Sequence, residues 1–121
     1  MIVVDTSVWV DHFRRRDQAL AASIAEGGIG LHPFVLGELL LGGLPAKSEV
    51  AKQLDILPRP PVASEIETAA FIAWAGLVGT GIGYVDTHLL ISAKLLADGR
   101  VMTRDKRLHA QAVRLGLVYE N

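Results

Sequence analysis

The segment Ile2-Val3-Val4-Asp5-Thr6-Ser7 contains the transition that decides the fold. Its three apolar, β-favouring residues end at an acid, and two hydroxyl residues follow that can cap a helix. In that helix Trp9, Val10 and Phe13 share one face. A short strand that passes directly into an amphipathic helix is typical of an α/β fold with parallel strands.

The same alternation of short apolar runs and helical patterns continues along the chain. We expect strands at residues 2–4, 29–31, 56–57, 101–103 and 117–119. Helices are expected to begin at Thr6 or Ser7, at Asp17, at Pro33, near Ala46, at the capping box Ser64-Glu65-Ile66-Glu67, near Tyr84 and at Lys106. The pattern predicts a mostly parallel sheet of about 4–5 short strands flanked by about seven helices. The helix after Ser64 is expected to carry Ile66, Ala70, Ala73 and Leu77 on one face.

The bulk composition indicates one folded domain over residues 1–121. Half of the residues are hydrophobic and 21% are charged, a balance that excludes a disordered chain. No apolar run approaches the ~20 residues of a membrane span, and no basic leader precedes an apolar segment, so we expect no membrane segment and no signal peptide. The absence of cysteine excludes disulfides, thiolate metal sites and cysteine nucleophiles, and it fits a cytoplasmic protein.

Positive charge is concentrated in two blocks of an otherwise nearly neutral chain. The formal net charge is −1, so the molecule as a whole does not attract nucleic acid. One block is Arg14-Arg15-Arg16, and the other consists of Arg100, Arg104, Lys106 and Arg107. Basic residues that border an acidic site could hold a phosphate backbone, although the arginine triplet alone is more typical of a solvated surface.

Four acidic residues from distant segments are placed to converge. Asp5 and Asp105 each follow a predicted strand, and ligands of open parallel sheets bind beyond the carboxyl ends of the strands. Asp86 lies in the first turn of its helix and would reach the same rim if that helix returns there. Glu38 lies on the helix that begins just after the second strand. These acids are therefore the candidate site.

Local explanations exist for three of these acids. Asp5 and Asp105 could each cap the helix that follows, and Asp86 could be a favourable anion near a helix N-terminus. Glu38 is harder to explain locally, because its leucine-rich neighbours leave little polar surface, although one face of the helix could still be exposed to solvent. The other acids fall on polar helix faces, at caps or near helix ends and are interpreted as structural: Asp11, Asp17, Glu26, Glu49, Asp55, Glu65, Glu67 and Asp98.

A divalent metal ion would explain carboxylates on apolar elements, because buried carboxylates are costly unless a cation pairs with them. The four histidines show no two-histidine metal spacing, so an all-oxygen site is expected, which suits Mg²⁺ or Mn²⁺ better than Zn²⁺. Ser7 and Thr103 could hydrogen-bond a carboxylate or a metal-bound water. The candidates for contacts with backbone phosphates are Arg104, Lys106 and Arg107.

Four segments of the chain resemble the motifs of PIN-domain nucleases. The opening Ile2-Val3-Val4-Asp5-Thr6-Ser7 is similar to the start of these proteins, and Glu38 is similar to their second acid. Tyr84-Val85-Asp86-Thr87-His88-Leu89-Leu90-Ile91-Ser92-Ala93 resembles the segment around the third acid. Val101-Met102-Thr103-Arg104-Asp105-Lys106-Arg107-Leu108 resembles the segment that carries the fourth. The resemblance covers nearly the whole chain in order, and it implies a PIN-like three-layer fold.

The short length is similar to that of VapC-type toxins of toxin–antitoxin pairs. That resemblance implies a Mg²⁺- or Mn²⁺-dependent endoribonuclease, usually a homodimer, that acts on RNA and is held inactive by an antitoxin protein. In the expected mechanism Asp5 is the central metal ligand, Asp86 and Asp105 complete the site directly or through water, and Glu38 binds a second ion or orients the attacking water. The alternative is a non-catalytic PIN-like module that binds RNA or protein. A receiver domain or an aspartyl phosphatase would need a further acid near Asp5, where Thr6 and Ser7 stand.

Overall fold

Seven helices surround three short strands in residues 1–120, the part of the chain that the computed structural model describes. In chain order the elements are β1 (Ile2–Val4), α1 (Thr6–Arg14), α2 (Gln18–Ala25), β2 (Ile29–Gly30), α3 (Pro33–Leu41), α4 (Glu49–Asp55), α5 (Glu65–Trp74), α6 (Tyr84–Leu95), β3 (Arg100–Met102) and α7 (Lys106–Arg114). The predicted α/β class and the helix number are confirmed.

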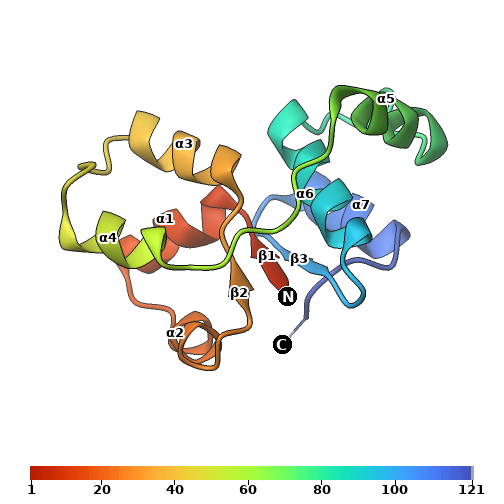
Figure 1. The fold of residues 1–121 in the computed structure, drawn as a ribbon. Coiled ribbons are helices and arrows are strands. Elements are labelled where there is room, and N and C mark those ends of the chain that lie inside the picture. The colour runs from red at the N-terminus through yellow and green to blue at the C-terminus, as the bar shows by residue number, and fades with distance from the viewer. Residues whose placement is uncertain (121) are drawn as a thin grey trace.

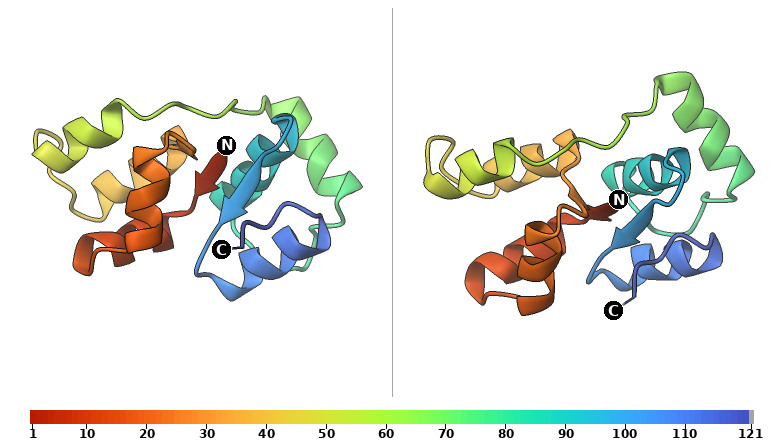
Figure 2. Two further views of the ribbon diagram at one scale, coloured as in Figure 1. Left: turned by 90° about the horizontal axis from the view of Figure 1, so that it is seen from below. Right: turned by 60° about the horizontal axis from the view of Figure 1, so that its bottom comes forward.

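The strands form one parallel sheet in the order β2-β1-β3. Ile2 pairs with both Ile29 and Arg100, so β1 is the central strand. Figure 1 shows α1 to α4 on one side of the sheet and α5 to α7 on the other, and Figure 2 shows the same division from two further directions. The arrangement therefore has three layers, with the carboxyl ends of all strands at one edge.

The core fills the space between the sheet and these two helical layers. Its largest fully buried side chains include Trp9 of α1, Leu20 of α2, Leu89 and Leu90 of α6 and Leu108 of α7. These residues belong to helices on both sides of the sheet, so each helical layer is fixed to the strands by apolar burial. Among residues 1–120, none of the helices combines the length and the apolar content that a membrane crossing requires.

Two of the predicted strands are absent from the described sheet, which has three strands rather than 4–5. The expected strand at residues 56–57 is instead a turn after α4, where Ile56 is 83% exposed and Pro58 follows. At residues 117–119 only Val118 forms a bridge, with Val101. The amide of Val101 donates to the carbonyl of Leu117, at 2.7 Å, and the amide of Tyr119 donates to the carbonyl of Val101, at 2.9 Å. This single contact is too short to extend the sheet.

Most helices begin at the predicted caps, whereas tertiary packing decides which face of a helix is buried. Asp17, Pro33 and the capping box of Ser64 and Glu67 begin their helices as predicted. The helix expected near Ala46 begins only at Glu49, because the Ser48 hydroxyl accepts the amide of Ala51.

The apolar face expected on α5 is exposed to solvent rather than packed in the core. Ile66 is 83% exposed, and the residues of α5 that are buried are Thr68 and Phe71. The helix also ends at Trp74, before Leu77. Spacing alone could not identify the buried face, since α5 is apolar on more than one side and α6 covers only one of them.

Candidate active site

The central pair of strands brings Asp5 and the Thr103–Asp105 segment to one edge of the sheet. Asp5 directly follows β1, and Thr103 directly follows β3. Val4 pairs with Met102 in parallel register, and the amide of Asp5 donates to the carbonyl of Met102 at 2.9 Å. The backbone after β1 is therefore bonded to the end of β3, as expected for acids that follow parallel strands.

The carboxylate of Asp5 is buried and oriented by two hydroxyl groups. Its exposed fraction is 5%, and its Oδ2 accepts hydrogen bonds from Ser7 Oγ and Thr103 Oγ1, both at 2.7 Å. The alternative role of Asp5 as a side-chain cap of α1 is wrong, because the side chain makes no cap hydrogen bond. Its second oxygen, Oδ1, accepts from no protein donor among residues 1–120 and is available to a ligand.

Two backbone amides extend this hydrogen-bond network into the loop before α7. The amide of Arg104 donates to Ser7 Oγ at 3.0 Å, and the amide of Asp105 donates to Thr103 Oγ1 at 3.0 Å. Each hydroxyl thus accepts from the loop and donates to Asp5. The network fixes the position of Asp105 relative to Asp5.

Asp105 does cap its helix. Its Oδ1 accepts the amides of Arg107, at 2.9 Å, and Leu108, at 3.0 Å. The capping role occupies only one carboxylate oxygen of this exposed residue. Capping and ligand binding are therefore compatible for Asp105.

Glu38 is exposed, on a solvent face of α3 that its leucine-rich neighbours do not cover. In α3 only Val35 and Leu39 are buried, and Leu41 is 90% exposed. The Oε1 of Glu38 accepts a hydrogen bond from Thr6 Oγ1 at 2.7 Å, which joins α3 to the start of α1. Sequence reasoning treated Thr6 only as a possible cap. Its position directly after Asp5 was the available signal.

Asp86 is the acid whose pKa responds to the charges of the other three. Asp86 is half-buried in the first turn of α6, and its pKa is raised from 3.8 to about 6. Desolvation by burial is the largest cause, followed by the charge of Asp5, with smaller contributions from Asp105 and Glu38. A hydrogen bond with the backbone of Gly83 partly offsets the rise.

The four acids have no cationic partner at ion-pair distance in the part of the chain that the structure describes. Two buried histidines stand near the starts of α3 and α6, but desolvation lowers the pKa of both, that of His32 to about 4, so both are neutral at pH 7. An external cation would relieve the repulsion at Asp86.

The donor set fits a hard divalent cation that keeps part of its water shell. All available donors are oxygens, including Asp5 Oδ1, as Mg²⁺ and Mn²⁺ prefer. No three histidine, aspartate or glutamate side chains in residues 1–120 enclose an ion by direct contact. Mg²⁺ commonly binds through one or two carboxylates and retains several waters, so an open rim of carboxylates suits it.

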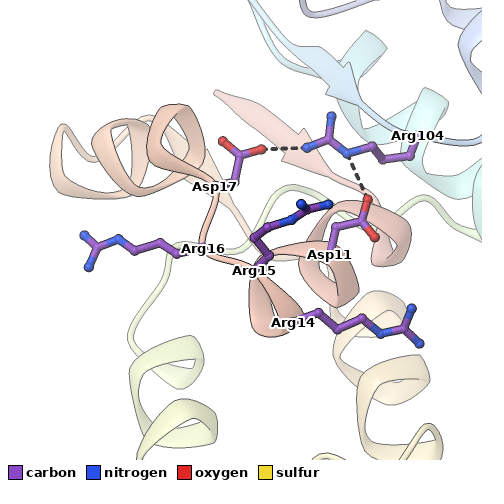
Figure 3. Close-up of a pocket in the computed structure, with 6 residues that line it drawn as sticks. All are labelled: Asp11, Arg14, Arg15, Arg16, Asp17 and Arg104. Atoms are coloured by element: carbon purple, nitrogen blue, oxygen red, sulfur yellow. Dashed lines mark hydrogen bonds and ion pairs between the residues drawn. The ribbon is translucent and has the colours of Figure 1, made fainter.

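The three predicted phosphate contacts differ in their surroundings. Arg104 is engaged in two ion pairs, from Nε to Asp11 Oδ2 at 3.1 Å and from a terminal nitrogen to Asp17 Oδ2 at 2.6 Å (Figure 3). This geometry favours a positioning role for Arg104, because its guanidinium holds the loop before α7 against α1 and the start of α2. Lys106 and Arg107 are exposed and form no ion pair among the described residues, and their contact with phosphate stays a prediction.

Comparison with known proteins agrees with this architecture. Residues 2–114 match the PIN domain family. The chain is also similar to Ribonuclease VapC32 of two Mycobacterium tuberculosis strains, CDC 1551 / Oshkosh and ATCC 25618 / H37Rv. In each case the identity is 38% over 117 residues, which cover 97% of this chain and 94% of the relative. The chain therefore belongs to the PIN-domain family and is related over nearly its whole length to VapC ribonucleases.

Proposed function

We propose that this protein is a Mg²⁺- or Mn²⁺-dependent endoribonuclease that acts as the toxin of a toxin–antitoxin pair. The observation that carries the proposal is the edge of the sheet. There the Asp5 carboxylate is buried and held by two hydroxyl groups, and burial together with the charges of Asp5, Asp105 and Glu38 raises the pKa of Asp86. Among residues 1–120 none of these four acids forms an ion pair. The relationship to proteins named ribonucleases supports RNA as the substrate.

In this proposal Asp5, Asp86 and Asp105 hold the metal ion directly or through water, and Glu38 holds a second ion or orients the attacking water. The ion would lower the pKa of a bound water and stabilise charge at phosphorus. Ser7 and Thr103 keep the Asp5 carboxylate aimed at the site, because each donates a hydrogen bond to its Oδ2. Thr6 orients Glu38 in the same way, because its hydroxyl donates a hydrogen bond to Glu38 Oε1.

Cleavage of RNA by the purified protein tests the proposed function. We expect labelled single-stranded or structured RNA to be cut in the presence of Mg²⁺ or Mn²⁺, to remain intact with a chelator, and to be cut again when excess metal is restored. Cleavage that continues in chelator would contradict the metal requirement. Binding of RNA without cleavage under any metal condition would favour the alternative, a non-catalytic PIN-like module.

Two exposed apolar regions support the proposed protein partners. The groove between α5 and α6, about 300 Å³, is lined by Phe71, Trp74 and Ile91, and it suits a second copy of the chain. Another cavity of about 360 Å³ has apolar walls that include Val10 and Phe13 and carries Glu38 at its rim, and it suits an antitoxin segment that places a basic side chain among the carboxylates.

We expect a homodimer that also binds a small antitoxin. Trp74→Glu should shift the protein towards the monomer in light scattering, since a charge would be buried in the proposed dimer contact. Val113→Glu, a change at a half-exposed residue outside that groove, is the matched control and should leave the dimer intact. A wild-type monomer at all concentrations, together with no neighbouring gene for a small partner, would count against both expectations.

A further inference from the structure

Charged residues alone line a large cavity at the end of α1. The cavity measures about 510 Å³ and is lined by Asp11, Arg14, Arg15, Arg16, Asp17 and Arg104. Four arginines face two aspartates, so the lining carries an excess of positive charge (Figure 3). This cavity contains the arginine triplet that, as sequence alone, is typical of a solvated surface.

The two aspartates are already engaged, and the triplet is not. Both Asp11 and Asp17 pair with Arg104, and Asp17 also accepts the amide of Leu20 as the cap of α2. Within residues 1–120, none of the three arginines of the triplet forms an ion pair. Figure 3 shows Arg14 and Arg16 extending away from the ion pairs in opposite directions, with Arg15 reaching towards Asp11 and Arg104. Three guanidinium groups are therefore available to an anionic ligand.

The cavity adjoins the candidate active site along two routes. Arg104 lies between Thr103 and Asp105, and its amide donates to Ser7 Oγ, which in turn donates to Asp5. Arg14 also lines the neighbouring cavity, which contains Thr6 and Glu38. Since α1 starts directly after Asp5 and rises by about 1.5 Å per residue, Arg14 lies roughly 14 Å from Asp5 along the helix. A single strand of RNA in the active site would reach this distance within a few nucleotides.

We propose that Arg14, Arg15 and Arg16 bind backbone phosphates of the RNA that flank the scissile bond. The inference rests on the proposed function and adds a substrate contact outside the carboxylate site. The molecule has a net charge of −1 and its active site is acidic, so attraction of a polyanion must come from a local cationic surface. Guanidinium groups pair well with phosphate oxygens, and such contacts are independent of base sequence. Arg104 lines the same cavity, but its guanidinium is paired with Asp11 and Asp17 and holds the loop before α7 in place.

Salt-dependent RNA binding in chelator tests this inference without cleavage. A labelled single-stranded RNA is titrated with wild type and with the triple variant Arg14→Gln, Arg15→Gln, Arg16→Gln between about 50 and 200 mM salt. At the lowest salt concentration we expect the variant to bind RNA about tenfold or more weakly than wild type. The slope of log affinity against log salt concentration should decrease in magnitude by about 2, since each lost phosphate contact with single-stranded RNA lowers it by roughly 0.7.

A matched control removes equal charge elsewhere. Lys47→Gln, Lys52→Gln, Arg59→Gln changes three exposed basic residues that line neither the arginine cavity, nor the cavity with Glu38, nor the groove between α5 and α6, and it should keep the wild-type slope. The triple Arg→Lys variant retains the charge and should retain most of the slope, which separates charge loss from a folding defect. Equal weakening by the control variant, or a wild-type slope in the variant that replaces Arg14, Arg15 and Arg16 by glutamine, would overturn the inference. Loss of antitoxin binding with unchanged RNA binding would overturn it as well and would assign the arginines to a protein interface.

Cleavage assays distinguish this inference from the proposed function. If wild type shows the steep arginine-dependent binding but never cuts RNA in Mg²⁺ or Mn²⁺, the proposed function fails and the RNA-binding surface stands. If wild type cuts RNA and the Arg→Gln variant binds as wild type does, the inference alone fails.

Discussion

Replacing Asp5 by asparagine is expected to lower the rate of metal-dependent RNA cleavage by about a hundredfold or more, since it removes the charge of the proposed central metal ligand. The fold should survive the change, because the amide oxygen of asparagine can still accept the hydrogen bonds of Ser7 and Thr103. Single-turnover cleavage rates at saturating Mn²⁺ measure the effect directly.

The matched control for this variant is Asp98→Asn. Asp98 is a highly exposed acid whose side chain pairs with Arg100 and with no other cation in residues 1–120, and it precedes β3 rather than following it. The Asp98→Asn variant should therefore cleave RNA at the wild-type rate. If Asp5→Asn cuts RNA at the wild-type rate, the assignment of the active site is wrong.

Replacing Asp86 by asparagine is expected to stabilise the metal-free protein at neutral pH and to weaken its response to Mn²⁺. The Asp86 carboxyl has a pKa of about 6 in the folded chain against 3.8 as its ordinary value, so it binds its proton more tightly when the protein is folded. Its stabilising contribution is present below about pH 4 and is lost as pH rises through about 6. The loss amounts to about 1–2 kcal/mol at pH 8, after allowance for solvent at this half-buried side chain.

Melting curves in chelator and in Mn²⁺ measure both effects. In chelator at pH 8 the Asp86→Asn variant should melt about 3–6 °C above wild type, and the difference should disappear near pH 4. With Mn²⁺, wild type should gain more stability than the variant, because the variant binds the ion less tightly. If Asp86 were only a favourable anion at the start of α6, the variant would be neutral or slightly less stable in chelator and would gain as much from Mn²⁺ as wild type.

Features of the fold that depend on local chemistry were predictable from the sequence. The side chain of Asp17 and the capping box of Ser64 and Glu67 satisfy backbone amides within three residues, so their effect is visible in the sequence. Features that depend on packing were not predictable. The exposed face of α5 and the single bridge at Val118 follow from where α6 and β3 lie in three dimensions.

The candidate site divides in the same way. Asp5 and Asp105 could be placed together because each follows a strand of a parallel sheet. The hydrogen bond from Thr6 to Glu38 and the ion pairs of Arg104 join segments that are 32 to 93 residues apart in the sequence. No local sequence pattern predicts such contacts. Asp11 and Asp17 are close in sequence to the arginine triplet but pair with Arg104 in the structure. The sequence alone does not show that these aspartates leave the triplet without their charge.

A crystal soaked in Mn²⁺ tests most directly whether the four acids form one metal site. The anomalous signal of manganese is predicted to appear at the carboxyl edge of β1 and β3, with Asp5 as a direct ligand and with Asp86 and Asp105 bound directly or through water. The same soak of Asp5→Asn should show a weaker signal or none. Manganese bound only away from Asp5, or an absent signal at saturating Mn²⁺ in crystals with open access to this edge, would contradict the proposed metal site.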